Sequence, residues 1–329
     1  MTARPLVIAH RGASGYRPEH TAAAYEVAIT QGADAVEPDL VPTRDGVLVV
    51  RHENEISGTT DVAAHPEFAH LKTTKMIDGV ELSGWFTEDF TWAELSTLRA
   101  KERLGDLRPA NTRFDGQQGI LRLTDLIDLL GSAERSVLMV AELKHATYFD
   151  SIGLALAPLL ASEMARFAKP DNLVVESFEQ TVLGEVQDLD VPGRVTFLAE
   201  QAGAPADQVA RYGGDARPYA DYLTDAGLSR LAAEVDGVSV EKALLLERDG
   251  AGAVTGTTDL VPRARAMGLE TYTWTLRAEN QFLEKDFRHG LRSRELGNWE
   301  REFDLIMRTG VDGVFADQPD LALRARAAL

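Results

Sequence analysis

Short apolar segments recur along the whole chain, and they alternate with stretches whose apolar residues have helical spacing. Strands that alternate with helices are typical of a parallel sheet covered by helices, and strands that are apolar almost throughout fit burial on both faces. The expected strands are residues 6–10, 35–40, 47–52, 137–144, 173–178, 194–200, 237–241, 270–276 and 313–317. The expected helices are residues 21–31, 123–130, 152–168, 181–189, 227–234, 260–267 and 301–309. This pattern predicts an α/β protein.

One of the nine candidate strands is surplus if the sheet closes into an eight-stranded barrel. The segment 35–40 is joined to the next one only by Thr-Arg-Asp-Gly, a turn sequence that is too short for a parallel crossover. We therefore expect an antiparallel hairpin here. Counting back from the turn sets Asp39 opposite Val50 and Glu37 opposite His52, on one face. The prediction is a TIM-type (β/α)8 barrel with a hairpin at its second strand.

Residues 53–118 interrupt the alternation of strands and helices. We interpret them as an insertion after the strand that carries His52, forming a subdomain or a cap over the barrel mouth. The rest of residues 1–329 then forms a single barrel domain. Four aromatic residues of the insertion are expected to form either its small core or an apolar groove for a ligand; they are Trp85, Phe86, Phe90 and Trp92.

Charge and composition exclude several classes of partner. A formal net charge of −18 argues against binding nucleic acid and against adsorption to anionic lipid. Cysteine is absent, which removes disulfides, thiolate metal sites and cysteine nucleophiles. No apolar run approaches the roughly 18 residues of a membrane span, so stable membrane insertion is not expected. Because the first strand is expected at residue 6, a secretory signal has no room, and we expect a cytoplasmic location.

Carboxylates occur in pairs with strand spacing. Glu37 and Asp39 are two residues apart on one expected strand and therefore share a face. Two neighbouring carboxylates repel each other unless water, a proton or a cation lies between them, and a hard divalent cation prefers such oxygen ligands. Glu142 and Lys144 repeat the spacing at the end of another strand, where catalytic residues of barrels lie. They are expected either to pair with each other or to supply a third metal ligand and a phosphate contact.

Two histidines end expected strands. His10 is followed by Arg11, whose guanidinium suits a phosphate, and His52 is expected beside the carboxylate pair. Histidine titrates near neutral pH and is suited to moving protons in both directions. The glycine-rich segment after Arg11 lacks the Walker pattern. No Gly-x-Ser-x-Gly follows a strand, which argues against a serine hydrolase.

Motifs that contain these polar residues extend over the whole chain. They are Ala9-His10-Arg11-Gly12-Ala13-Ser14-Gly15, Pro18-Glu19-His20-Thr21, Glu37-Pro38-Asp39, Thr43-Arg44-Asp45-Gly46, His52-Glu53, Glu142-Leu143-Lys144, Ser177-Phe178, Thr273-Trp274-Thr275 and residues 310–319. In this order they resemble the glycerophosphodiester phosphodiesterase family, in particular its larger bacterial members with an insertion. The family more often has asparagine at the position of His20 and aspartate at that of Glu53.

This resemblance implies hydrolysis of a small-molecule glycerophosphodiester to glycerol 3-phosphate and an alcohol, through a cyclic glycerol phosphate. One divalent ion, Ca²⁺ or Mg²⁺, is implied as cofactor. The implied metal ligands are Glu37, Asp39 and Glu142. The implied general acid and base are His10 and His52, and the phosphate contacts are Arg11 and Lys144. Further substrate contacts are implied for Glu176, Phe178, Trp274 and Phe315.

Two other functions stay open at this point. One is a lysophospholipase D-like activity on the same barrel, which needs an apolar groove for an acyl chain. The other is a barrel that binds phosphate compounds without turnover. The loop at residues 287–299 carries Arg288, Arg292 and Arg294, which are expected to be solvated rather than bound to an anionic head group. The alcohol, the native metal and the oligomeric state are left open.

Overall fold

A computed structural model describes residues 4–329, and within this range eight parallel strands close into a barrel. They are β1 (Leu6–His10), β2 (Ala35–Glu37) continued by β3 (Asp39–Pro42), β7 (Leu138–Leu143), β8 (Leu173–Ser177), β9 (Arg194–Ala199), β10 (Gly237–Glu241), β13 (Glu270–Leu276) and β14 (Gly313–Ala316). Each pairs with the next in chain order, β2 and β3 both pair with β7, and β14 pairs with β1 to close the ring. The predicted TIM-type barrel is confirmed.

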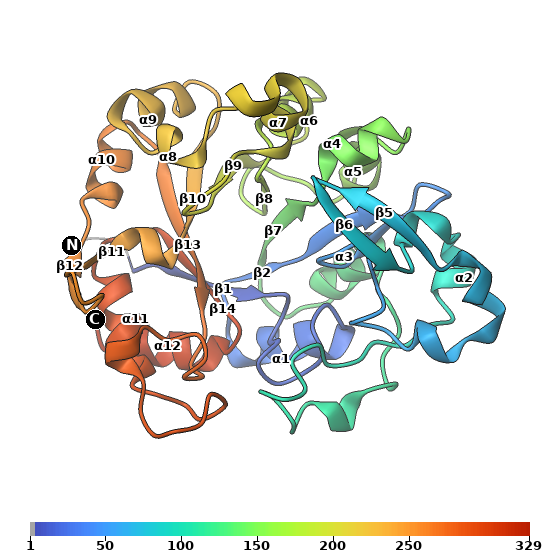
Figure 1. The fold of residues 1–329 in the computed structure, drawn as a ribbon, viewed down its shortest axis with the longest axis horizontal. Helices are drawn as coiled ribbons and strands as arrows, with labels where there is room; N and C mark the ends of the chain where they lie inside the picture. Colours follow the sequence, from blue (N-terminus) through green and yellow to red (C-terminus); the bar gives the residue numbers. More distant parts are fainter. Residues whose placement is uncertain (1–3) are drawn as a thin grey trace.

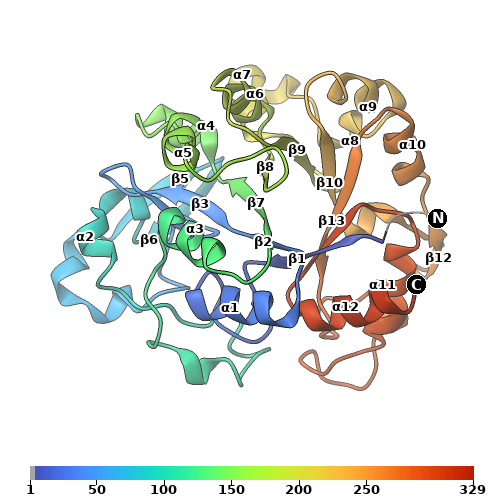
Figure 2. The ribbon, with the colours of Figure 1, turned by 180° about the vertical axis from the view of Figure 1, so that it is seen from behind.

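Helices surround this barrel (Figure 1), as is also seen from behind (Figure 2). They are α1 (Ala22–Gln31), α3 (Leu123–Gly131), α4 (Ala146–Ser151), α5 (Leu156–Met164), α6 (Gln180–Asp188), α7 (Ala206–Tyr212), α8 (Tyr219–Tyr222), α9 (Asp225–Leu231), α10 (Leu260–Ala266), α11 (Trp299–Met307) and α12 (Pro319–Ala327). The Thr21 hydroxyl caps α1 by accepting from the Ala24 amide at 3.2 Å. The helix expected at 152–168 is present as α5 but is shorter, and α4 precedes it as a separate helix.

The apolar residues form two clusters, one on each side of the strands. The larger cluster lies between the strands and the surrounding helices. The smaller one draws one residue from each of six strands and therefore fills the barrel interior; it consists of Ile8, Ala35, Val140, Val174, Tyr272 and Phe315. Since successive side chains on a strand alternate between the two faces, the residue two positions after each of these also points into the barrel.

The predicted hairpin is present, but its predicted register is wrong by one residue. β4 (Leu48–Val50) runs antiparallel to β3 and pairs Leu40, not Asp39, with Val50. Thr43 pairs with Val47, so the loop contains three residues instead of the expected two. The last of them, Gly46, has φ +76°. A three-residue loop with glycine in the left-handed region is a common hairpin connection. The strand also breaks at Pro38, where its pairing changes from β1 to β4.

The segment of residues 53–118 follows β4 and precedes α3. It contains the antiparallel hairpin of β5 (Thr73–Ile77) and β6 (Val80–Gly84), the short helix α2 (Trp92–Leu95) and 3₁₀ turns η1 (Val62–Ala64), η2 (Pro66–Leu71), η3 (Thr87–Asp89) and η4 (Thr112–Phe114). Of the four aromatic residues considered above, Trp85, Phe86 and Phe90 are buried, and the ring of Phe68 packs edge-on against that of Phe90 with centroids 5.1 Å apart. Phe68, Trp85 and Phe90 belong to the same large apolar cluster as the outer face of the barrel.

Two smaller features complete the fold. β11 (Leu246–Arg248) and β12 (Val254–Thr257) form a hairpin, and the 3₁₀ turns η5 (Gly213–Asp215), η6 (Lys242–Leu245) and η7 (Lys285–Phe287) lie in connections. Among residues 4–329 we find no helix with the length and apolar character required to span a bilayer.

Candidate active site

Five polar side chains and one tryptophan point into the barrel at the carboxyl ends of its strands, which is where catalytic residues of such barrels lie. Each stands two positions after a residue of the interior cluster. They are His10 after Ile8, Glu37 after Ala35, Glu142 after Val140, Glu176 after Val174, Trp274 after Tyr272 and Asp317 after Phe315. Pairing between strands sets His10 beside Glu37 and Glu142 beside Glu176. The strand period and the barrel register thus bring distant segments together.

A cavity of about 980 Å³ opens over these residues. Apart from Asp39, every site residue expected from the sequence lines it; these are His10, Arg11, Glu37, His52, Glu142, Lys144, Glu176, Phe178, Trp274 and Phe315. The wall also includes Met76, Asp78, Gly79 and Val80, which belong to the β5–β6 hairpin of the insertion. Arg288, Arg292 and Arg294 lie outside this lining.

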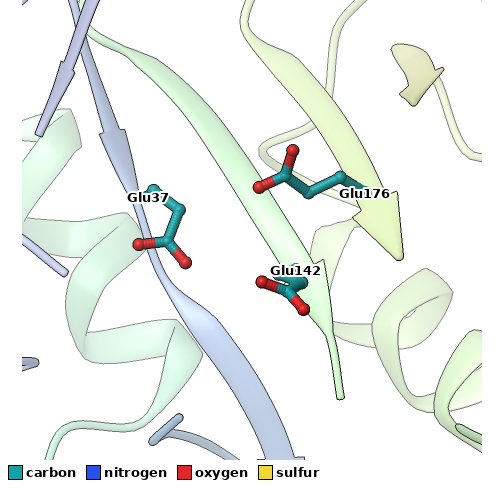
Figure 3. A group of neighbouring side chains, drawn as sticks. All are labelled: Glu37, Glu142 and Glu176. Atoms are coloured by element: carbon teal, nitrogen blue, oxygen red, sulfur yellow. The ribbon is translucent and has the colours of Figure 1, made fainter. Parts of the chain in front are cut away.

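Three carboxylates on neighbouring strands converge in the cavity. Glu37, Glu142 and Glu176 each place one oxygen within 4.8 Å of the others, and Figure 3 shows the side chains extending toward one another from β2, β7 and β8. Burial raises the pKa of all three, with further repulsion from neighbouring carboxylates, and the pKa of Glu142 rises to about 8. Glu176 Oε2 is buried without a hydrogen-bond partner. Such a set of buried, converging carboxylate oxygens fits a hard divalent cation.

Asp39 has a different environment from these three. Its Oδ2 accepts from His20 Nε2 at 2.8 Å, and its Oδ1 lies 3.3 Å from Lys144 Nζ. Burial works against its ionised form, yet Lys144 and His52, together with the His20 hydrogen bond, hold the pKa of Asp39 well below its usual range. Asp39 is therefore an anion with a hydrogen bond at Oδ2 and a cation near Oδ1, and this Oδ1, like Glu176 Oε2, is buried without a hydrogen bond. Its assignment as a metal ligand stays a prediction.

His10 is held through its Nδ1 atom. This nitrogen lies 2.7 Å from Asp317 Oδ1, so the ring donates Nδ1–H and leaves Nε2 as the acceptor. Arg11 Nε lies 3.3 Å from that Nε2. Burial and the charge of Arg11 lower the pKa of His10 to about 4. Asp317 in turn accepts from Arg108 Nη2 at 2.6 Å and from Arg277 Nε at 2.8 Å.

His52 is held in the same way by a different carboxylate. Its Nδ1 lies 2.8 Å from Glu53 Oε1, which again leaves Nε2 as the acceptor. Burial lowers the pKa of His52 to about 3, and Arg11 and Lys144 lower it further. β4 ends at Val50, so a bend in the chain, not the pairing of the hairpin, brings His52 to the cavity.

Two cationic side chains, Arg11 and Lys144, lie among these carboxylates and histidines. Arg11 Nη1 pairs with Glu19 at 3.2 Å, and Lys144 Nζ pairs with Glu142 at 2.7 Å. Although burial opposes ionisation, the surrounding carboxylates raise the pKa of both cations above their ordinary values. The turn that presents Arg11 depends on Gly12, which has φ +79° and whose missing Cβ would lie 2.8 Å from the Ala24 backbone.

Aromatic rings form the apolar side of the cavity. Phe178 meets Trp274 edge-on with ring centroids 5.7 Å apart, and Lys144 Nζ lies 5.6 Å from the Phe178 ring centre. Phe315 belongs to the buried interior cluster and forms the floor. Trp85, Phe86, Phe90 and Trp92 are not among the residues that line this cavity.

Sequence reasoning missed several residues that hold the site together. Asp317 and Glu53 each bind a histidine, and His20 binds Asp39 from a fully buried position. Asp317 ends an expected strand and Glu53 directly follows His52, so their positions in the sequence could have indicated a role in the site. For Arg108, which lies in the insertion, no such indication exists in the sequence.

With this chemistry gathered at one end of a TIM-type barrel, the protein falls among the barrel hydrolases that act on phosphoric esters. Comparison with known proteins narrows the class. A family model described as the glycerophosphoryl diester phosphodiesterase family matches residues 10–321. The chain belongs to this family, and the resemblance found in its motifs is confirmed.

Similar proteins agree with this membership. The chain is 30% identical to a glycerophosphodiester phosphodiesterase of Arabidopsis thaliana, over 96% of this chain and 84% of that relative. It is 26% identical to a glycerophosphodiester phosphodiesterase of Bacillus subtilis, over 97% and 85%. A putative glycerophosphoryl diester phosphodiesterase of Silicibacter pomeroyi shares the fold with a TM-score of 0.70 at 21% identity, over 100% and 95% of the two chains.

An Oleispira antarctica phosphodiesterase solved with its product sn-glycerol-3-phosphate shares the fold with a TM-score of 0.64 at 19% identity, over 98% and 96%. As a member of its family, the present chain is a phosphoric diester hydrolase whose substrates are glycerophosphodiesters.

Proposed function

We propose that the protein hydrolyses a glycerophosphodiester to glycerol 3-phosphate and an alcohol, with one divalent cation and with His10 and His52 as general acid and base. The observation that carries this proposal is the matched support of the two imidazoles. Each is held at Nδ1 by a carboxylate, Asp317 or Glu53, and both line one cavity with three buried carboxylates.

A divalent cation fits the carboxylate cluster on chemical grounds. Burial and mutual repulsion favour protonation of Glu37, Glu142 and Glu176, and a cation relieves that repulsion by binding their oxygens. These three, or Asp39 in place of Glu176, would hold Ca²⁺ or Mg²⁺. When bound, the ion would polarise a phosphate oxygen and favour ionisation of a nearby hydroxyl.

Arg11 and Lys144 are suited to bind the phosphate. Both line the cavity, and both stay protonated because carboxylates surround them. A phosphodiester carries one negative charge, and cations that face the reacting phosphate stabilise charge that develops in the transition state. Phe178, Trp274 and Phe315 supply an apolar wall for the rest of the substrate, and Glu176 lines the same cavity.

The two histidines move the protons. Each neutral ring presents Nε2 as an acceptor, so one can take the proton of the attacking hydroxyl. The other must then carry a proton on Nε2 and give it to the oxygen of the departing alcohol. The carboxylate at each Nδ1 stabilises the imidazolium that forms in turn. Addition of water returns both rings to their starting protonation states.

We also propose that residues 53–118 are an inserted subdomain of a single barrel domain and act as a cap. Its hairpin tip lines the cavity, which supports this assignment. A lysophospholipase D-like activity would need the aromatic residues of the insertion to form a groove for an acyl chain. Trp85, Phe86, Phe90 and Trp92 lie outside the cavity lining, so hydrolysis of glycerophosphodiesters is better supported.

The test is turnover of a panel of glycerophosphodiesters, with and without a chelator and with Ca²⁺ or Mg²⁺ restored. Glycerol 3-phosphate should appear in a metal-dependent manner, and His10→Ala and His52→Ala should each reduce kcat at least roughly 100-fold. Faster turnover of lysophosphatidylcholine than of glycerophosphocholine favours the lysophospholipase D-like activity. Binding without turnover favours the non-catalytic barrel.

A further inference from the structure

The tip of the β5–β6 hairpin is hydrogen-bonded to the barrel near the cavity. Asp78, at the turn of this hairpin, places Oδ2 2.6 Å from His145 Nδ1. His145 follows β7 directly after Leu143 and Lys144 and precedes α4. The other nitrogen of its ring, Nε2, lies 3.2 Å from Glu53 Oε2. A residue of the insertion thus reaches, through one imidazole, the carboxylate that binds His52.

Both nitrogens of His145 face carboxylate oxygens, which accept hydrogen bonds and cannot donate them when ionised. Each nitrogen must therefore donate, and the ring is a cation between two anions. Burial opposes this charge, but the hydrogen bonds to Asp78 and Glu53 outweigh it and raise the pKa of His145 to about 9. His145 also has φ +53°, a conformation that non-glycine residues keep only where their surroundings hold them.

Glu53 depends on this anchor because it is not held by burial. Its side chain is 42% exposed, whereas those of His145 and His52 are 18% and 28% exposed. One oxygen of Glu53 binds His145 and the other binds His52. With the first contact removed, water competes for the carboxylate and its plane is free to turn. The ring of His52 would then lose the partner that keeps its proton on Nδ1 and leaves Nε2 facing the cavity.

We propose that Asp78 is a positioning residue for His52 and acts through His145 and Glu53. The inserted hairpin is then part of the catalytic apparatus and orients an acid/base group from outside the barrel. This inference rests on the proposed function, in which His52 moves a proton. Supporting residues of this kind commonly change activity by about 10- to 100-fold when they are lost.

The test compares Asp78→Gly with Glu81→Ala. Asp78 has φ +47°, which glycine adopts without strain, so the turn is retained. Glu81 is an exposed carboxylate on β6 of the same hairpin, without a salt bridge, and is the matched control. Asp78→Gly should lower kcat roughly 10-fold with little change in KM or melting temperature, while Glu81→Ala stays near wild type. Asp78→Asn should recover part of the activity, because its amide oxygen still accepts from His145.

A double-mutant cycle separates the relay from a general effect of the cap. In a His145→Gln background, Asp78→Gly should cause little further loss of kcat, because the contact is already broken. An undiminished loss in that background overturns the proposal. The proposal is also overturned if the kcat of Asp78→Gly lies within twofold of that of Glu81→Ala. In that case the proposed function still stands. A wild-type chain without turnover on the metal-supplemented panel refutes the proposed function instead.

The positioning role also has a readout without turnover. NMR of the imidazole nitrogens reports which one of His52 carries the proton. Asp78→Gly should change the His52 signals toward a mixture of tautomers, and Glu81→Ala should not. Identical His52 signals in both variants overturn the inference whatever the activity.

Discussion

The carboxylate of Asp317 joins His10 to two arginines, one from the insertion and one from the barrel. It is 2% exposed, its Oδ1 accepts from His10 Nδ1 at 2.7 Å, and its Oδ2 accepts from Arg108 at 2.6 Å and Arg277 at 2.8 Å. Replacing it with asparagine keeps the shape but leaves one acceptor oxygen. Because two guanidinium groups compete for that oxygen, the new amide nitrogen must face His10.

This change acts on the proton of His10. An amide N–H that faces Nδ1 turns that nitrogen into an acceptor and drives the ring proton to Nε2, the atom that must be free in the step of the proposed mechanism in which His10 accepts a proton. A hydrogen bond to a charged group contributes about 1.5–3 kcal/mol, which corresponds to roughly a 10- to 150-fold change in rate. We therefore expect Asp317→Asn to lower kcat about 100-fold, with a smaller change in KM.

The assay is release of glycerol 3-phosphate from a glycerophosphodiester under saturating metal. Glu279→Gln is the matched control, because Glu279 is the other carboxylate partner of Arg108, at 2.7 Å, and does not touch His10. Both variants weaken the pairing of a buried arginine and should melt at lower temperature. Only Asp317→Asn should lose turnover. If its kcat stays within about threefold of Glu279→Gln, the assigned role of this carboxylate is wrong.

Three further results are expected. Metal binding near pH 8 should release protons, because the pKa of Glu142 is raised to about 8, and Glu176→Gln should weaken metal binding more than Asp39→Asn does. Calorimetry in buffers of different ionisation enthalpy measures both the proton release and the affinity. If Asp39→Asn weakens binding more, Asp39 is favoured as the ligand. Gly12→Ala should lower the free energy of unfolding by about 1–3 kcal/mol, since its φ is +79°; an unchanged urea midpoint contradicts this. The carboxylate partners of His145 outweigh its burial and raise its pKa from 6.5 to about 9. The stability that the charged ring contributes is therefore complete below pH 6.5 and is lost as pH rises through about 9. Urea titrations over this range should show a fall in the free energy of unfolding, and His145→Gln should reduce that fall.

The amino-acid sequence by itself determined the barrel and most of its polar lining. The bounds of β1, β10 and β13 match the expected strands, because apolar runs bounded by turn residues have few other ways to bury both faces. The two-residue period then sets which side chains point inward. His10, Glu37 and Glu142 could be found in this way, since each ends a buried strand with a polar group that needs a partner.

Only the tertiary structure decided how those groups share their partners. The register of the hairpin depended on one extra loop residue, and Glu176 converges with Glu37 and Glu142 because β8 lies beside β7. Arg108 and Asp78 come from an insertion whose approach to the barrel leaves no local pattern in the sequence. Periodicity specifies the face on which a side chain lies, but contacts between distant segments depend on how the closed barrel and its insertion pack.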